Sequence, residues 1–302
     1  MHGLGERTLS LDFAADLGAL SLNLEMGAYE TLWQTDKATL PKLVSRTSQT
    51  AVQLASALVD AKEALSNAER VRKYHGDRGI RDFGISVYQS FDYPARLRDA
   101  KHPIDVVQYL GNWGLVFQPS VAVVGARTPS AEGLRRARKL VRELAADNFV
   151  IVSGMAAGID TEVHQTALRV GAPTIGVLGT PISDAYPKGN ADLQRTIATK
   201  HLALSQVPVL RYSRQSWHHN RFFFPARNIT MAALTKATII VEASDTSGTL
   251  VQARAALAQQ RMLFILDSCF HNPDITWPAK FERLGAIRVA DYADVRRHLV
   301  LH

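Results

Sequence analysis

Three short segments of the chain are rich in glycine, serine and threonine, residue types that bind phosphate groups through backbone and hydroxyl donors. They read GARTPSAEG at 125–133, SGMAAGID at 153–160 and EASDTSGT at 242–249. Glycine lets a ligand approach the backbone closely, and Arg127 adds a fixed positive fork for the same anion. Any one segment could equally be a tight turn between a strand and a helix. Together with Arg127 they predict a phosphate site whose candidate residues are Gly125, Ser130, Ser153, Gly154, Ser247, Gly248 and Thr249.

A fourth segment, RYSRQSWHHNRFFFPARN at 211–228, alternates basic and aromatic residues. Cations that follow a phosphate backbone, beside aromatic rings on which bases stack, are typical of proteins that bind single-stranded nucleic acid. We therefore add Arg221, Phe224 and Arg227 to the candidate site. At least one of the three consecutive phenylalanines at 222–224 is expected to belong to the core instead.

The elements that must position these residues follow from the hydrophobic pattern. Continuous apolar runs bounded by glycine indicate buried parallel strands, and helical patterns alternate with them. The expected strands are 120–127, 149–154, 174–179, 202–207, 237–244 and 262–267, and the expected helices are 131–148, a segment beginning near Asp160, 227–236 and 248–261. This order predicts an α/β fold with a doubly wound, mostly parallel, Rossmann-like sheet. Ligands of such sheets bind beyond the carboxyl ends of the strands, where the three glycine-rich segments would meet.

The first 78 residues have a different pattern and predict a small helical domain. Apolar residues recur at spacings near three and four along 40–65. The chain then becomes polar and reaches two glycines, Gly76 and Gly79. We place the boundary there, with a helical domain at 1–78 and the Rossmann-like domain at 79–302.

The net charge of +7 and the isoelectric point near 9.6 favour a polyanionic partner. Charge alone does not distinguish this from basic residues scattered over the surface. The single cysteine, Cys269, excludes an internal disulfide and a zinc site built on thiolates. The adjacent His218 and His219 do not share a helical face and have no cysteine or carboxylate nearby in the sequence, so we expect no metal.

The amino-terminal residues carry acidic groups and lack the pattern of a signal peptide, and no apolar run approaches the length of a membrane span. A cytoplasmic protein without a membrane partner is expected. The first glycine-rich segment is not GxGxxG, and GxxxxGK[ST] does not occur, so the fingerprints of dinucleotide binding and of P-loop ATP hydrolysis are missing. No cofactor is expected.

The order of five motifs resembles the DprA/Smf family of DNA-processing proteins from about Phe91 to Leu266. The motifs are GARTPS, SGMAAGID followed by His164, YPKGN, FPARN, and VEA with SGT. The resemblance implies a homodimeric protein of natural transformation and DNA recombination. Such a protein would bind single-stranded DNA, protect incoming DNA and help load the RecA recombinase. It also implies that Arg127, Arg227 and Asn228 contact DNA phosphates, with Arg221 assisting.

The resemblance further likens the helical amino-terminal region to a SAM-like or helix-hairpin-helix domain, and no winged-helix domain is expected after the last helix.

Two other functions remain open. The wider superfamily includes phosphoribohydrolases that act on nucleotide sugars with a glutamate, but Gln252 stands at that position and a glutamine cannot act as a general base. Asp160 and Glu242 are the carboxylates near the expected pocket, although Asp160 could instead cap its helix. We therefore expect no enzyme. A module that senses a small nucleotide is the other alternative, and the aromatic and basic segment favours a polymer over it.

Overall fold

A computed structural model describes residues 5–34, 54–88, 90–101 and 104–300 of the chain. Within them one nine-stranded sheet has the strand order β1-β2-β6-β5-β4-β3-β7-β8-β9. The strands are β1 (Gly84–Val87), β2 (Val106–Gly111), β3 (Ser120–Val124), β4 (Val150–Ser153), β5 (Thr174–Leu178), β6 (Leu202–Ser205), β7 (Ala237–Ile240), β8 (Met262–Leu266) and β9 (Ile287–Val289). The β1–β2 and β2–β6 pairs are antiparallel, and all other neighbouring pairs are parallel. The expected mostly parallel, doubly wound sheet is confirmed.

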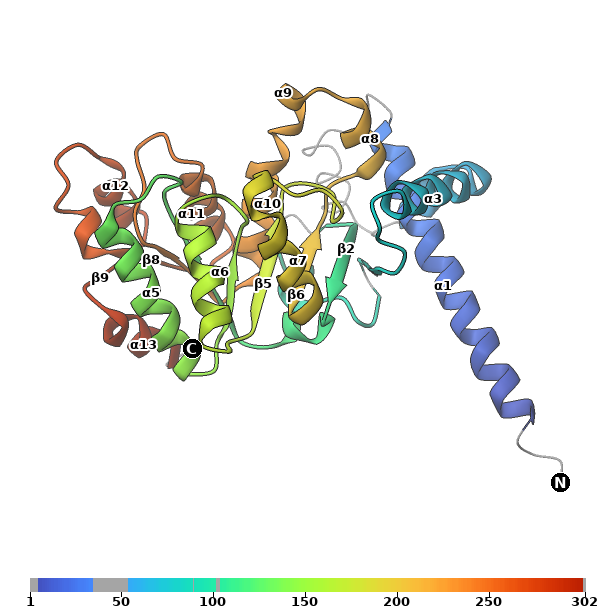
Figure 1. The fold of residues 1–302 in the computed structure, drawn as a ribbon, viewed down its shortest axis with the longest axis horizontal. Helices are drawn as coiled ribbons and strands as arrows, with labels where there is room; N and C mark the ends of the chain where they lie inside the picture. The colour runs from blue at the N-terminus through green and yellow to red at the C-terminus, as the bar shows by residue number, and fades with distance from the viewer. Residues whose placement is uncertain (1–4, 35–53, 89, 102–103, 301–302) are drawn as a thin grey trace.

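Helices cover both faces of this sheet (Figure 1). On one face lie α5 (Ala131–Ala146), α6 (Ile159–Arg169) and α13 (Tyr292–Val300), and on the other α10 (Phe223–Leu234), α11 (Thr249–Ala258) and α12 (Trp277–Arg283). The α7 helix (Ala191–Lys200) packs beside β5 and β6. None of the described helices combines the length and the low charge that crossing a membrane requires.

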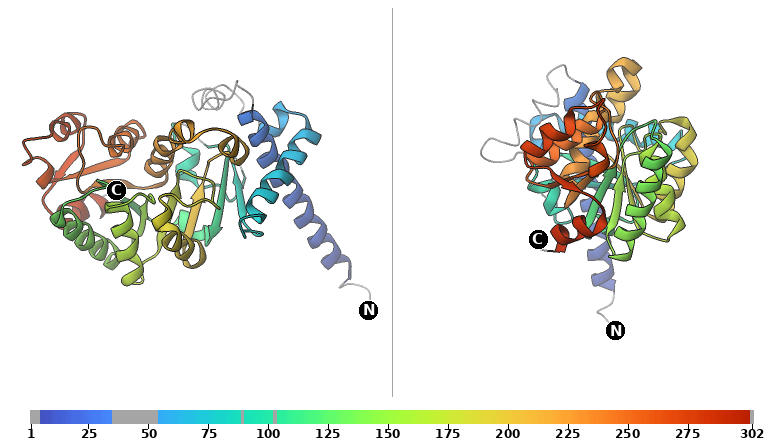
Figure 2. Two further views of the ribbon diagram at one scale, coloured as in Figure 1. Left: turned by 45° about the horizontal axis from the view of Figure 1, so that its top comes forward. Right: turned by 90° about the vertical axis from the view of Figure 1, so that its left-hand side faces the viewer.

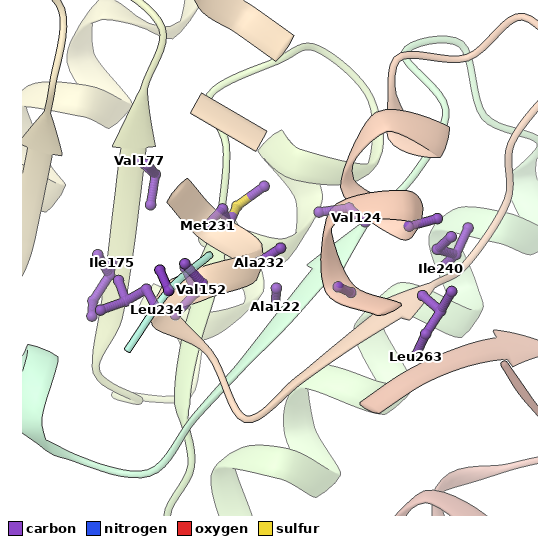
Figure 3. Packing of buried hydrophobic residues seen from close by; sticks show 14 of the residues in the cluster. Ala122, Val124, Val152, Ile175, Val177, Met231, Ala232, Leu234, Ile240 and Leu263 are labelled. Atoms are coloured by element: carbon purple, nitrogen blue, oxygen red, sulfur yellow. The ribbon is translucent and has the colours of Figure 1, made fainter. Parts of the chain in front are cut away.

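Alternate residues of the central strand β3 face opposite cores. Val121 and Val123 pack beneath α5 and α6. Ala122 and Val124 pack beneath α10 and α11, where Met231 of α10 lies over them (Figure 3). Burial on both faces explains why the strand is a continuous apolar run rather than an alternating one.

The amino-terminal helices α1 (Gly5–Gln34) and α3 (Ala61–Gly76) lie beside β1 and β2, with the short helix η1 (Ala55–Leu58) between them in sequence. The amino-terminal end of α1 projects away from the sheet (Figure 2). A helical amino-terminal part agrees with the sequence pattern, although the expected apolar repeat at 40–52 lies outside the described residues. The domain boundary after residue 78 stays a prediction.

The antiparallel strands β1 and β2 and the edge strand β9 were not expected from the sequence. The β1 and β9 strands have only four and three residues, and the six residues of β2 neither alternate strictly nor form a continuous apolar run. Their pairing therefore depends on the partner strand rather than on their own pattern. The remaining short helices are α4 (Ala95–Arg98), η2 (Trp113–Phe117), η3 (Lys188–Asn190), α8 (Val209–Arg214), α9 (Trp217–Asn220) and η4 (Asp267–Cys269).

Candidate functional site

The loops that follow β3 and β4 interlock at the carboxyl edge of the sheet. Gly158 has a φ of +81°, and a Cβ at this position would lie 2.4 Å from the carbonyl oxygen of Ala126 and 2.5 Å from that of Arg127. The next residue, Ile159, donates its backbone N–H to Ala126 at 3.1 Å. Only glycine meets both the backbone conformation and the close approach. The first two glycine-rich segments therefore form one surface, and Arg127 stands on it.

Arg227 is buried on α10, with 5% of its surface exposed. Its Nη1 donates to the carbonyl of Val177 at 2.8 Å, and its Nε donates to Oδ1 of Asn228 at 2.8 Å. Gly154 makes room for the guanidinium, because a Cβ there would lie 2.0 Å from Nη1. A guanidinium carries five N–H donors and stays protonated in proteins, so donors remain for an anion in front of Arg227.

Asp160 is the buried carboxylate that compensates this arginine. It is 6% exposed and accepts a hydrogen bond from the backbone N–H of Ala156 at 3.3 Å. Burial raises the pKa of Asp160, and the positive charges of Arg227 and Arg127 act in the opposite direction. Burial likewise lowers the pKa of Arg227, and Asp160 opposes that change. Each charge offsets part of the cost of burying the other.

Asn228 connects α10 to the amino-terminus of α11. Its Nδ2 donates to the carbonyl of Gly248 at 3.0 Å. In the same loop Ser247 Oγ accepts the backbone N–H of Thr249 at 3.2 Å, and the Thr249 hydroxyl donates to the carbonyl of Gly125 at 3.3 Å. The third glycine-rich segment is thus joined to the first segment and to the helix that carries Arg227.

His164 supports the second segment from behind. It is completely buried, and its ring nitrogens lie 2.8 Å from the carbonyl oxygen of Gly154 and 2.8 Å from the hydroxyl of Thr174. Burial lowers its pKa to about 4, so the ring is neutral at neutral pH. Because a carbonyl only accepts, the proton of the neutral ring is assigned to Nε2, which donates to Gly154. Nδ1 contacts the hydroxyl of Thr174, which itself donates to the carbonyl of Ile151 at 2.8 Å.

These segments and α10 surround an open pocket of about 520 Å³. Nine of the twelve residues predicted for the site line it: Gly125, Arg127, Arg221, Phe224, Arg227, Asn228, Ser247, Gly248 and Thr249. Arg127 and Arg221 are exposed. None of the ion pairs between described residues involves either of them. With Asp160 the only carboxylate among the lining residues, the three arginines leave the pocket positively charged.

Tyr186, Trp217 and Phe224 form one wall of the pocket and are referred to below as the aromatic cluster. Their ring centroids are 4.5 Å apart for Tyr186 and Trp217, 5.2 Å for Tyr186 and Phe224, and 5.8 Å for Trp217 and Phe224. Gly179 lets the ring of Phe224 rest on the backbone, since a Cβ there would lie 2.4 Å from that ring. Trp217 is 44% exposed and Tyr186 39% exposed. Partly exposed rings of this kind can stack on planar groups of a ligand.

The three consecutive phenylalanines divide between pocket and core. Phe223 is 5% exposed and packs with residues of α1, whereas Phe222 is 61% exposed and lines the pocket with Phe224. The expectation that one of the three belongs to the core is confirmed.

Ser130 lies outside the pocket although it was predicted to bind phosphate. Its Oγ accepts the backbone N–H of Gly133 at 2.9 Å, which caps α5, and its hydroxyl donates to Glu242 at 2.8 Å. Glu242 also accepts the backbone N–H of Ser130 at 3.2 Å. A carboxylate of the chain itself therefore occupies the amino-terminus of α5, the position at which an anion would bind.

Ser153 and Gly154 also lie beneath the pocket rather than in its lining. The buried Ser153 hydroxyl donates to the carbonyl of Val123 at 2.8 Å, and Gly154 underlies Arg227. Their contribution to the site is to bring β4 close to its neighbours.

Tyr186 is the main pocket residue that sequence reasoning did not select. It belongs to the YPKGN segment, far in sequence from the aromatic residues at 217 and 224, and no periodicity connects the two. The occurrence of YPKGN among the five ordered motifs is the signal that could have identified it.

The carboxylate among the residues that line the pocket is Asp160, which is buried beside Arg227. Gln252 lines it, is almost fully buried and donates Nε2 to the hydroxyl of Thr238 at 3.2 Å. His218 and His219 are exposed on α9, and His219 Nδ1 lies 3.0 Å from the hydroxyl of Ser216. In the described part of the chain no three metal-binding side chains gather.

Comparison with known proteins gives consistent matches. A family model described as DNA recombination-mediator protein A matches residues 84–299. Protein Smf from Synechocystis sp. is 38% identical over 190 residues, which cover 61% of this chain and 45% of that protein. The chain thus spans about half the length of this relative.

Two solved structures share the fold. The X-ray structure of DNA processing protein A from Streptococcus pneumoniae has a TM-score of 0.62 and 28% identity, over 92% of this chain and 93% of that one. DNA processing protein A from Helicobacter pylori, whose structure is described as showing a single-stranded DNA binding mode, has a TM-score of 0.60 and 27% identity. That match covers 72% of this chain and 96% of the other.

Proposed function

The chain belongs to the DNA recombination-mediator protein A family, which includes DprA and Smf, and from this premise we propose that it binds single-stranded DNA in the pocket described above. The observation that carries the proposal is the position of Arg127 and Arg221, exposed and without ion pairs among the described residues, next to the aromatic cluster. A single strand offers phosphates and unpaired bases together, and this pocket has a complementary group for each.

Phosphates would contact the arginines and the donors around them. Arg127 and Arg221 provide exposed charge in the pocket lining, while Arg227 is held in place by Val177 and Asn228. Neutralising phosphates releases counterions, which makes such binding weaken steeply with salt. Asp160 reduces the charge of the pocket and offsets part of the cost of burying Arg227.

Bases would stack on the aromatic cluster. Each base stacked on an aromatic side chain contributes about 1–3 kcal/mol in proteins that bind single strands. Because Trp217 and Tyr186 are each more than a third exposed, ring surface is available for a base without any rearrangement. A mononucleotide would use only part of this surface, which favours the polymer.

The proposal is tested by fluorescence anisotropy with labelled oligothymidine over a series of salt concentrations. Wild type is expected to bind with log K falling about 0.7 per log unit of salt for each phosphate contacted. Arg127→Ala and Arg221→Ala should bind more weakly and with a shallower slope. Arg142→Ala is the matched control, since Arg142 is exposed, makes no ion pair with a described residue, and is absent from the pocket lining.

Three results would contradict the proposal. One is the absence of salt-dependent binding by wild type. Another is equal binding by wild type and Arg127→Ala. The third is displacement of the oligonucleotide by thymidine monophosphate at a similar concentration, which would favour a nucleotide-sensing module instead.

We further propose that the chain acts as a homodimer that protects DNA and loads a RecA-type recombinase onto it. The description of the family as a recombination mediator supports the action on a recombinase. The homodimer and the protection of DNA rest on the resemblance to DprA and Smf proteins. Nuclease protection of single-stranded DNA, recombinase filament formation on DNA covered by single-strand-binding protein, and sedimentation at several concentrations test the three parts separately. A monomer at all concentrations, unprotected DNA, or unchanged filament formation would each remove the corresponding part.

A further inference from the structure

The amino-terminal helices α1 and α3 form one packed unit. A Cβ at Gly27 of α1 would lie 1.8 Å from the carbonyl oxygen of Ala64 of α3, so the two backbones are in contact. Between the helices, Nδ2 of the buried Asn67 donates to the hydroxyl of Thr31 at 2.9 Å. A displacement of one of these helices would therefore move the other.

The α1 helix holds the segment that leads to Trp217 and Phe224. Glu30 is completely buried, and its carboxylate accepts the backbone N–H groups of Val209 at 2.7 Å and Leu210 at 2.9 Å, at the start of α8. The adjacent Tyr29 hydroxyl donates to the carbonyl of Gln206 at 2.7 Å. Figure 1 shows α8 between α1 and α9, the short helix that begins with Trp217.

A second contact of α1 reaches the phenylalanines. The ring of Trp33 packs edge-on against Phe223, with centroids 6.0 Å apart. Phe223 stands between Phe222 and Phe224 in the sequence, so fixing its ring inward directs its neighbours to the pocket. Arg211 strengthens this contact by placing its guanidinium 5.3 Å from the centre of the Trp33 ring.

The α3 helix holds the loop that carries Tyr186. Its Tyr74 hydroxyl donates to Asp184 at 2.7 Å, and Nε of Arg78, just past the helix end, lies 3.0 Å from the other oxygen of that carboxylate. His75 contacts the hydroxyl of Ser183 at 2.9 Å. These partners precede Tyr186 by only two and three residues.

The side of the pocket formed by the glycine-rich loops, Arg127 and Arg227 lacks such contacts. Among the described residues, no hydrogen bond, ion pair or ring contact of α1 or α3 reaches the glycine-rich loops, Arg127 or Arg227. The two halves of the site are supported by different parts of the chain.

We propose that α1 and α3 set the geometry of the aromatic cluster, with Glu30 and Tyr74 as positioning residues, so that base stacking depends on these helices and phosphate binding by Arg127 and Arg227 does not. This inference rests on the proposed binding of single-stranded DNA. It assigns the helical amino-terminal part a role in distinguishing a strand with bases from a bare phosphate chain.

The test compares binding of two ligands of equal length, an oligothymidine and an abasic oligonucleotide with the same phosphates. Wild type should bind oligothymidine at least about tenfold more tightly, as expected when one or more bases stack. In Glu30→Gln the amide offers one acceptor where the carboxylate offered two, so one backbone donor of α8 is left unmatched. The affinity ratio should then fall by at least about threefold, because the abasic ligand keeps its contacts with Arg127 and Arg227 and loses less affinity than oligothymidine does.

Glu25→Gln is the matched control. Glu25 is also a buried carboxylate on α1 and accepts a backbone N–H, that of Ser56 at 3.1 Å, but it does not contact the 206–224 segment. Its substitution should leave the ratio unchanged. Tyr74→Phe removes one hydroxyl and serves as the second variant if Glu30→Gln does not fold, with circular dichroism as the check on folding. Quenching of tryptophan fluorescence by oligothymidine should decrease in parallel with the ratio.

The outcomes separate the two proposals. If wild type binds neither ligand in a salt-dependent way, the proposed function itself fails. If wild type binds both ligands equally, or if a folded Glu30→Gln or Tyr74→Phe lowers both affinities alike or neither, the positioning role is wrong while DNA binding stands. The positioning role is also wrong if Glu25→Gln lowers the ratio as much as Glu30→Gln does.

Discussion

Replacing His164 by glutamine should remove an acid-sensitive contribution to stability beneath the pocket. The buried ring donates to the carbonyl of Gly154 and contacts the hydroxyl of Thr174. A glutamine can reproduce the donation to Gly154 through its amide nitrogen, but it does not titrate. The variant therefore separates the titration of the ring from its packing.

The magnitude follows from the change in pKa. Burial lowers the pKa of His164 from its ordinary value of 6.5 to about 4, so between these pH values the unfolded chain binds more protons than the folded protein. The stability contributed by the neutral ring is complete above pH 6.5 and is lost as the pH falls towards 4. At 1.36 kcal/mol per pH unit the loss amounts to about 2 kcal/mol at pH 5 and about 3 kcal/mol at pH 4.

Urea denaturation of wild type and His164→Gln at pH 7, 6 and 5 measures this difference. The wild-type profile alone would not reveal it, since burial raises the pKa of Glu30 to about 7 and this group contributes with the opposite sign over the same range. Subtracting the variant from wild type cancels the Glu30 contribution. His218→Gln, at an exposed position on α9, is the control. A difference between wild type and His164→Gln that is the same at pH 7 and pH 5 would refute the reasoning.

Three further predictions concern buried charges and close contacts. In wild type, the raised pKa of Glu30 means that the folded protein loses stability as the pH rises from 4.5 to 7, because the buried carboxyl must ionise. Glu30→Gln does not titrate, so its stability relative to wild type should increase by about 3 kcal/mol over this range. Urea denaturation at several pH values checks this, and a pH-independent difference contradicts it. Asp160→Asn should lower the free energy of unfolding by about 3 kcal/mol, because Arg227 is left buried without its carboxylate. The same variant should bind oligothymidine more tightly at low salt, because the pocket loses its negative charge. Weaker binding by the folded variant in anisotropy would oppose this. Gly154→Ala should displace the Arg227 guanidinium, because the added Cβ would overlap it. In the anisotropy assay, oligothymidine binding should weaken about tenfold and the salt slope should fall by about 0.7, which corresponds to the loss of one phosphate contact. An unchanged slope would show that Arg227 does not contact phosphate.

Much of the fold could be predicted from the sequence because buried parallel strands carry their own signal. Strands with both faces covered, such as β3 and β4, must be continuous apolar runs, and the turns at their carboxyl ends need glycine. The predicted strands from β3 to β8 therefore agree with the structure. The strands β1, β2 and β9 carry no comparable signal, and their positions follow from the neighbours with which they pair.

The sequence by itself also determined the chemical character of the site, since glycine, hydroxyl and arginine residues at strand ends converge in any doubly wound sheet. Tertiary structure decided which of these residues are available to a ligand. Glu242, 112 residues away, takes the amino-terminus of α5 that Ser130 was expected to offer to phosphate. Tyr186 meets Trp217 and Phe224 only in the folded chain, where Ser183 and Asp184 of its loop contact α3. Burial and long-range contacts are properties of the folded chain, and no local spacing encodes them.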